Sequence, residues 1–218
     1  MVSAQDNDVV SDATDSPREL LASLFLSGDQ PGRASTPDAG VRGENDGAIV
    51  SARLVLERAA ARARARGLVV VELGVQDQGE TRALASFHAA IAMQSVRFGR
   101  PAADTLLLSA GPVNAGEGDN QAARFQLALA LSLDAHPAIH ALALDVVNLA
   151  SRNRCTGFVL GPDTVARARN LGLDAGAQLL AGRAQALFEK LGDRVEVGGA
   201  GAPMVLRAVY LRAGPDAN

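Results

Sequence analysis

Residues Leu106–Leu131, LLLSAGPVNAGEGDNQAARFQLALAL, are the stretch that decides the fold class. An apolar run typical of a buried strand leads into a glycine-rich loop, and a helix with almost no charge follows. In this arrangement, backbone N–H groups and a helix N-terminus can face an anion. The loop carries Glu117 and Asp119 but no lysine or arginine. The stretch therefore favours an α/β fold but gives little support for an anion site.

The composition describes a chain with an ample core and no strong electrostatic preference. Of 218 residues, 48% are hydrophobic but only 3% aromatic, so the core must consist mainly of alanine, leucine and valine. A net charge of −3 gives no basis for nucleic-acid binding, which usually requires a basic face. The chain contains no apolar run of the ~18–20 residues that a membrane span needs. The acidic start MVSAQDNDVVSD resembles neither a secretory signal nor a transit peptide. We expect a soluble, cytoplasmic protein with no nucleic-acid or membrane partner.

The chain divides by composition into a polar N-terminal part and a larger folded part. Residues 1–46 are predicted to be a flexible tail that carries one short helix, residues 17–27, because Ser16, Pro17 and Glu19 form a helix start. Asp46 is expected to cap a long helix that Gly67 ends. The elements expected after it are strand 68–71, helix 80–97, strand 104–109, a helix after the glycine loop, strand 139–147, an apolar run at 157–160, helices within 163–191, and strands 194–197 and 204–212. The alternation predicts an α/β fold with a mostly parallel sheet and helices on both faces.

The histidines offer little chemistry. His88 stands among apolar neighbours on a predicted helix, and we interpret it as a packed residue rather than a catalytic one. His136 and His140 have a spacing that suits a metal site only on a continuous helix. Pro137 interrupts such a helix, so a surface loop is the preferred interpretation.

The arginines and the cysteine have similarly plain interpretations. The arginines at positions 58–66 are interpreted as a solvated helix face rather than a phosphate or nucleic-acid patch, because Glu57 interrupts the basic run and it contains no aromatic residue. Cys155 is the single cysteine, which excludes an intrachain disulfide. Arg152 and Arg154 would lower the pKa of its thiol, but an unreactive buried cysteine is the favoured interpretation.

Several collinear segments resemble the bacterial and archaeal glycerate 2-kinases, a family also named hydroxypyruvate reductases, and in particular its C-terminal module, the MOFRL domain. LLLSAG resembles the family's LLSGGE, and GDNQAARFQLALAL resembles GRNQEFALALAL. GPDTVARARNLGLDAGAQLLAG is close to the family's helix pair, and FEKLGDRVEVGGAG resembles FEALGDLLVTGPTG. The resemblance implies that residues 47–103 are a remnant of the kinase N-terminal domain and residues 104–213 a MOFRL-like domain. It also implies that most of the domain completing the nucleotide and glycerate cleft is missing.

The chain departs from the family at the loops that the resemblance marks as functional. The arginine and glutamate of GRNQE become Asp119 and Ala122, and the carboxylates of TDGIDGPTD fall on Val147, Ala150 and Arg154. Phosphoryl transfer needs positive charge at the phosphates and carboxylates for magnesium. The resemblance therefore implies a scaffold without catalytic residues or a metal site. The ligand-binding residues that it still implies are Ser109, Gly111, Gly118, Asn120, Gln121, Gly198 and Gly201.

Three hypotheses follow from this mixture of likeness and loss. In the first, the chain is a catalytically inactive glycerate-kinase-like protein that acts as a binding or assembly scaffold without a cofactor, as a homo-oligomer or with a protein partner. In the second, it is an enzyme subunit that phosphorylates glycerate with ATP and magnesium when a separate nucleotide-binding chain completes it. In the third, the remodelled cleft supports new chemistry, with Cys155 as the nucleophile. The predicted helix at 17–27 either docks a partner or, as we prefer, covers the chain's own core.

Overall fold

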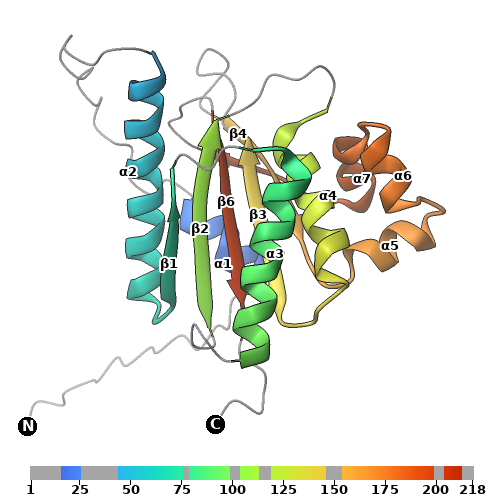
Figure 1. The fold of residues 1–218 in the computed structure, drawn as a ribbon, viewed down its shortest axis with the longest axis horizontal. Coiled ribbons are helices and arrows are strands. Elements are labelled where there is room, and N and C mark those ends of the chain that lie inside the picture. The colour runs from blue at the N-terminus through green and yellow to red at the C-terminus, as the bar shows by residue number, and fades with distance from the viewer. Residues whose placement is uncertain are drawn as a thin grey trace, which may run out of the picture.

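The computed structural model describes residues 16–25, 44–75, 79–98, 104–112, 119–145, 154–198 and 204–212, and side chains are described for these residues except 44–51, 112, 154 and 198. They form a six-stranded sheet with helices on both faces (Figure 1). The predicted α/β class is confirmed.

The sheet has the strand order β1-β2-β6-β3-β4-β5. The C-terminal strand, β6, lies in its middle and pairs antiparallel with both β2 and β3. All the side chains of β6 are buried, as expected for a central strand with both faces covered. The strands are β1 (Val69–Gly74), β2 (Thr105–Pro112), β3 (Ile139–Asp145), β4 (Arg154–Leu160), β5 (Arg194–Gly198) and β6 (Met204–Leu211).

We predicted a mostly parallel sheet. Most of the strands do run in one direction, but most strands that lie next to each other are antiparallel. Strands β1, β2, β3 and β5 run one way, and β4 and β6 run the other way. Only β1 and β2 are parallel neighbours, because β6 lies between β2 and β3 and β4 lies between β3 and β5. Alternation of strands and helices predicts the direction of a strand, but it does not predict which strand becomes its neighbour.

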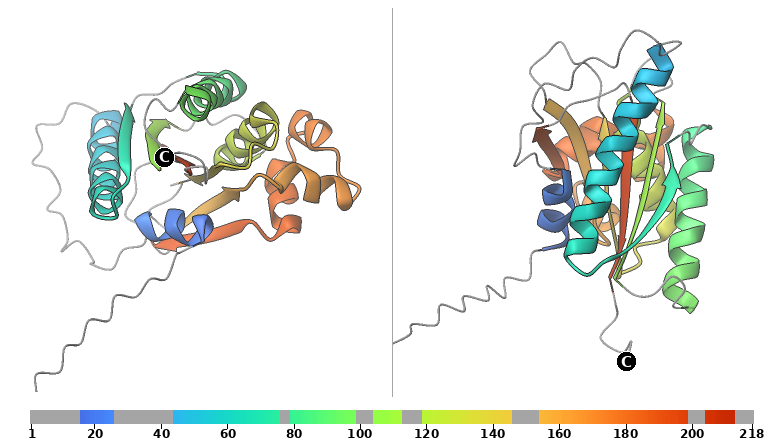
Figure 2. Two further views of the ribbon diagram at one scale, coloured as in Figure 1. Left: turned by 90° about the horizontal axis from the view of Figure 1, so that it is seen from below. Right: turned by 90° about the vertical axis from the view of Figure 1, so that its left-hand side faces the viewer.

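Five helices cover one face of the sheet, and α4 lies at the centre of this layer (Figure 2). Its side chains are buried almost all round, which fits the presence of a single charged residue, Arg124, in the helix. The Nε2 atom of Gln126 donates a hydrogen bond to the carbonyl of Phe158 at 2.7 Å and ties α4 to β4. The helices are α3 (Thr81–Phe98), α4 (Gln121–Leu133), α5 (Thr164–Asn170), α6 (Ala175–Leu180) and α7 (Ala184–Leu191).

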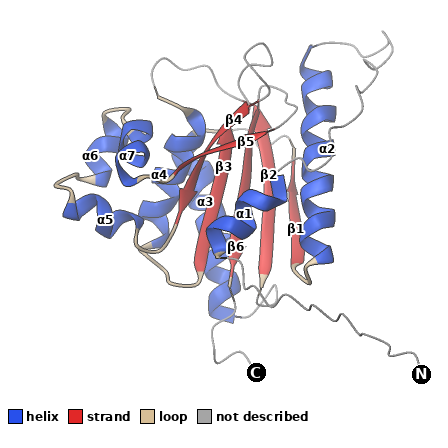
Figure 3. Ribbon diagram, turned by 180° about the vertical axis from the view of Figure 1, so that it is seen from behind, coloured by secondary structure: helices blue, strands red, loops and turns tan. Residues whose placement is uncertain are grey.

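The opposite face is covered by α1 (Pro17–Phe25) and α2 (Glu44–Ala65) (Figure 3). Helix α2 begins at Glu44, so the prediction that Asp46 caps it is wrong; Gly67, at φ = 80°, follows its end as predicted. Small residues such as Ala59 and Ala63 make the buried face of α2 and let the helix approach the sheet closely. No helix in the described ranges is both long enough and apolar enough to cross a membrane.

Helix α1 covers the chain's own core, which supports the preferred interpretation of this segment. Its start is the predicted one, because the Glu19 carboxylate accepts hydrogen bonds from the backbone N–H and the hydroxyl of Ser16, at 3.0 and 2.8 Å. Leu21 and Leu24 are fully buried against the sheet. Residues 26 and 27 of the predicted helix, and most of the tail, lie outside the described residues.

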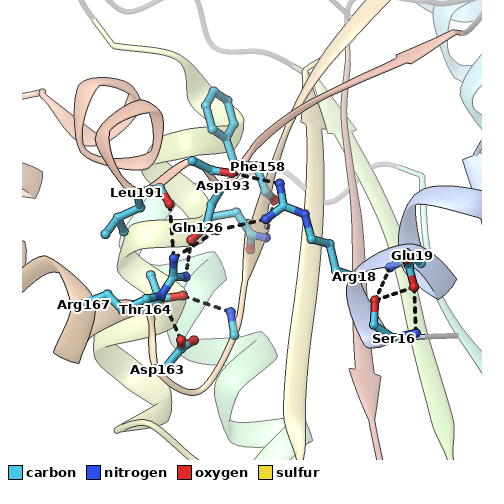
Figure 4. Close-up of polar contacts among 12 residues, drawn as sticks. Ser16, Arg18, Glu19, Gln126, Phe158, Asp163, Thr164, Arg167, Leu191 and Asp193 are labelled. Atoms are coloured by element: carbon cyan, nitrogen blue, oxygen red, sulfur yellow. Dashed lines mark hydrogen bonds and ion pairs between the residues drawn. The ribbon is translucent and has the colours of Figure 1, made fainter.

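Polar contacts fix both ends of α1. At its N-terminal end, Arg18 reaches the buried Asp193, which Arg167 of α5 also contacts (Figure 4). At its C-terminal end, Arg62 donates to the carbonyl of Leu24 at 2.8 Å, and Arg66 donates to the hydroxyl of Ser23 at 2.7 Å. Arg62 of α2 and Arg66, which follows its end, therefore hold α1 in place, which corrects in part the interpretation of these arginines as a solvated helix face.

Candidate functional site

One edge of the sheet collects the loops at which the resemblance places function. The carboxyl ends of β1, β2, β3 and β5 lie at this edge, together with the amino ends of β4 and β6. Helices α3 and α4 also begin here (Figure 1). In α/β proteins this edge is the usual place for a ligand. The connecting segments 76–78, 113–118, 146–153 and 199–203 lie outside the described residues, so the site is seen from the ends of its strands.

The residues predicted for the site fall into two separate groups. Ser109 and Gly111 lie on β2, and Asn120 and Gln121 begin α4. Gly198 ends β5, which is four strand positions from β2, or roughly 19 Å at the usual strand spacing. The structure therefore does not bring Gly198 beside Ser109. Gly118 and Gly201 lie outside the described residues.

Ser109 is hydrogen-bonded to a buried histidine. The Nδ1 atom of His88 lies 2.8 Å from the carbonyl oxygen of Leu84, and Nε2 lies 2.8 Å from Oγ of Ser109. Because a carbonyl can only accept, Nδ1 carries the proton, and the Ser109 hydroxyl donates to Nε2. Both side chains are about 1% exposed, so His88 is a packed, hydrogen-bonded residue, as predicted.

Asp119 contacts the chain's own backbone instead of facing an open loop. Its carboxylate accepts hydrogen bonds from the N–H groups of Ala184 at 2.5 Å and Gln185 at 3.0 Å, which begin α7. It also accepts one from the N–H of Asn120 at 3.1 Å. A carboxylate at a helix N-terminus satisfies N–H groups without a helical partner and interacts favourably with the helix dipole. Asp119 thus joins the start of α4 to the start of α7.

Asn120 and Gln121 also make structural contacts. The Oδ1 atom of Asn120 accepts a hydrogen bond from the N–H of Ala123 at 3.0 Å, which makes Asn120 the N-cap of α4. The Oε1 atom of Gln121 lies 3.4 Å from the hydroxyl of Thr81, at the start of α3. Three of the predicted ligand-binding side chains, those of Ser109, Asn120 and Gln121, therefore have contacts within the protein.

The structure adds two buried charged residues that sequence reasoning missed. Arg207 of β6 is 5% exposed, and its Cζ lies 4.9 Å from the centroid of the Phe125 ring, within cation–π range. Asp145, at the end of β3, is 6% exposed. Because Arg207 pairs with Ala143 and Asp145 with Val205, the two charged residues are diagonal neighbours on one face of the sheet. The sequence pattern that could have identified Arg207 and Asp145 is a charged residue within an otherwise apolar strand.

Cys155 is buried, and His140 lies within a strand. Burial, and then the negative charge of Asp145, raise the pKa of the Cys155 thiol, which disfavours the thiolate. His140 lies on β3 rather than on the predicted surface loop, because the apolar residues on both sides of it form the strand. The centroid of its ring is 6.5 Å from that of the Tyr210 ring. The described part of the chain holds no group of three or more histidine, cysteine or acidic residues suited to a metal ion.

Sequence comparison finds relatives of greater length. The chain is 33% identical over 157 residues to an Agrobacterium vitis protein named hydroxypyruvate reductase, a match that covers 69% of this chain and 41% of the relative. A second Agrobacterium vitis protein of the same name is 31% identical over 170 residues, which cover 75% of this chain and 39% of the relative. The chain thus spans about two fifths of the length of these relatives. No protein-family model matches it.

Comparison of folds finds two solved structures with a similar arrangement of strands and helices. The structure superposes on glycerate kinase from Thermotoga maritima with a TM-score of 0.65 and 15% identity, over 74% of this chain and 41% of the kinase. It superposes on a protein from Pyrococcus horikoshii with a TM-score of 0.63 and 17% identity, over 75% of this chain and 39% of that one. The sheet and helices described above are therefore the fold of part of a glycerate kinase.

Proposed function

We propose that this chain is a catalytically inactive glycerate-kinase-like protein that acts as a binding or assembly scaffold. The sequence relatives and the kinase-like fold support the glycerate-kinase-like part of the proposal. The loss of catalysis is inferred from the chemistry of the loop edge.

The proposal rests on one observation: the polar side chains at the loop edge of the sheet form hydrogen bonds within the protein itself. Asp119 accepts hydrogen bonds from three backbone N–H groups, Asn120 caps α4, and the hydroxyl of Ser109 is bonded to His88. Transfer of a phosphoryl group requires donors and cations aimed at the phosphate and oxygen ligands for magnesium. Here Asp119 places a negative charge between the start of α4 and the N-terminus of α7, where it opposes an anionic substrate.

A kinase assay on the purified full chain tests the loss of catalysis. The chain is incubated with ATP, magnesium and glycerate, and phosphoglycerate is measured by mass spectrometry beside the Thermotoga maritima glycerate kinase as positive control. We expect no phosphoglycerate above the level obtained with heat-denatured chain. Turnover that rises in proportion to chain concentration would overturn the proposal.

Native mass spectrometry of the chain purified from its own host tests the scaffold role. We expect the chain to carry a bound protein or metabolite of defined mass. The alternative function, an enzyme subunit completed by a separate nucleotide-binding chain, predicts a different result. In that case a polypeptide resembling the remainder of a glycerate kinase co-purifies, and the complex phosphorylates glycerate.

A further inference from the structure

A cavity opens between α4, α5 and the start of α6, helices that lie together at one end of the molecule (Figure 1). Its volume is about 390 Å³, at the small end of the range of roughly 300–1,000 Å³ that small-molecule sites occupy. Leu131, which lines the cavity, follows the first residue of α4 by ten positions, or roughly 15 Å along the helix. The cavity is therefore separate from the loop edge of the sheet, where α4 begins.

Aliphatic side chains form the walls of this cavity. Leu131 belongs to α4, Val165 to α5, and Leu173 to the connection between α5 and α6. Leu131 is 38% exposed, although most residues of α4 are buried. The described residues that line the cavity include no aromatic side chain. Such walls suit a compact aliphatic group, because covering them removes apolar surface from water.

One arginine and one aspartate also line the cavity. Arg169 is exposed at the C-terminal end of α5, and its guanidinium makes no hydrogen bond or ion pair with a described residue. Asp174 uses Oδ1 to accept a hydrogen bond from the N–H of Ala177 at 2.7 Å, and its Oδ2 has no partner in the described part of the chain. The cavity therefore offers a ligand one positive and one negative group.

We propose that this cavity binds an α-amino acid with an aliphatic side chain. The carboxylate of the ligand pairs with Arg169, whose planar guanidinium can donate two parallel hydrogen bonds to it. The ammonium group of the ligand donates to Oδ2 of Asp174, and its side chain covers Leu131, Val165 and Leu173. A simple carboxylic acid would leave Asp174 without a partner, and a simple amine would leave Arg169 without one. A zwitterion uses both charges.

The surroundings of Asp174 make it suitable for recognition. The hydrogen bond from Ala177 makes Asp174 the N-cap of α6, so the position of its carboxylate is fixed before a ligand arrives. Gly176 also lines the cavity, and a Cβ atom there would lie 3.3 Å from Oδ1 of Asp174. The glycine therefore keeps the approach to the carboxylate open. Because the cavity lies away from the loop edge, this inference does not rest on the proposed function.

An NMR titration of the isotope-labelled full chain with L-leucine tests the site. We expect saturable binding with a dissociation constant of about 1 mM or lower. Arg169→Gln and Asp174→Asn should each raise that constant at least about tenfold, because each removes the partner of one ligand charge. Arg169 is exposed, and asparagine keeps the oxygen that caps α6, so both variants should retain the circular dichroism spectrum of the parent. The matched control is Arg53→Gln, on the helix that covers the opposite face of the sheet, which should leave the constant unchanged.

Two analogues of leucine separate the contributions of its charges. Isocaproate lacks the ammonium group and isopentylamine lacks the carboxylate, so each should bind the parent chain at least about tenfold more weakly than leucine. In Asp174→Asn, leucine and isocaproate should bind alike. The proposal is overturned if leucine does not bind the parent at about 10 mM, ten times the expected constant, or if neither variant weakens its binding. Isocaproate that binds the parent as tightly as leucine would also overturn it, because the site would then recognise a carboxylate alone.

Discussion

Asp193 connects three parts of the structure, and its removal is the sharpest test of how the helices are held. Its side chain is 5% exposed and contacts Arg18 of α1 at 3.2 Å and both Nη atoms of Arg167 in α5. Asp193→Ala removes the contacts with both arginines. Stranding a buried charge costs about 3–5 kcal/mol, but here each arginine keeps other partners. Arg167 retains Asp163 at 2.8 Å, and Arg18 retains the carbonyl of Gly192 at 2.9 Å.

We therefore expect Asp193→Ala to lower the free energy of unfolding by about 2–3 kcal/mol. Arg18 is 44% exposed, and its pair with Asp193 is screened by water, so Arg18→Ala should cost only about 0.5–1 kcal/mol. Arg167→Ala should cost more than Arg18→Ala because it also loses the contact with Asp163. Together, the three variants show whether the contact of Asp193 with α5 or its contact with α1 contributes more to the free energy of unfolding.

Urea unfolding followed by circular dichroism measures these differences, with two-state behaviour and an unchanged slope as conditions. The control is Arg53→Ala, which breaks an exposed ion pair with Glu57 and should change stability by less than about 0.5 kcal/mol. If Asp193→Ala costs no more than this control, Asp193 does not hold the helices together. If Arg18→Ala equals Asp193→Ala, α1 rather than α5 depends on the carboxylate, and the ranking is refuted.

Four further predictions follow from individual residues. Burial, and then the charge of Arg212, lower the pKa of His140, so the folded state binds fewer protons than the unfolded state. The free energy of unfolding should therefore rise with pH between that lowered pKa and about 6.5. The variant His140→Asn should remove this rise when urea unfolding is measured at several pH values. Cys155 should react with Ellman's reagent at least about tenfold more slowly in the folded chain than in urea; equal rates would refute its burial. Gly157→Ala should cost about 1–3 kcal/mol, because the new Cβ would lie 2.5 Å from Cδ2 of Leu144; an unchanged urea midpoint would contradict this packing. Asp119→Ala should cost about 1–2 kcal/mol by urea unfolding, since it removes the cap of α7, and an unchanged midpoint would show that the cap is dispensable.

The local elements could be predicted from the sequence because their signals are local. The stretch Leu106–Leu131 predicts a strand, a loop and a helix, and β2 and α4 occupy these places. The capping role of Ser16 and Glu19 is readable because both residues lie in the first turn of α1. In each case the deciding contacts join residues that are close in the chain.

Strand order and side-chain contacts could not be predicted because their causes are distant in the chain. Strand β6 lies beside β2 and β3 because its mostly apolar faces need cover on both sides, and no local pattern names its neighbours. Asp119 reads as an acidic loop residue until α7 places two N–H groups beside it, 65 and 66 residues further along. The contact of Arg207 with Phe125 likewise joins distant segments.

The resemblance described above implies that Asp119 stands where the glycerate 2-kinases carry an arginine. If the position carried arginine, as the resembling family does, the side chain could donate hydrogen bonds but could not accept those of Ala184 and Gln185. Compared with the arginine that the resemblance implies, the aspartate carries no positive charge, and it satisfies the N-terminus of α7. Restoring arginine alone would remove that cap and leave its N–H groups without acceptors. Acidic character at this loop is thus built into the packing of α7, so the proposed change of function involves the scaffold as well as the site.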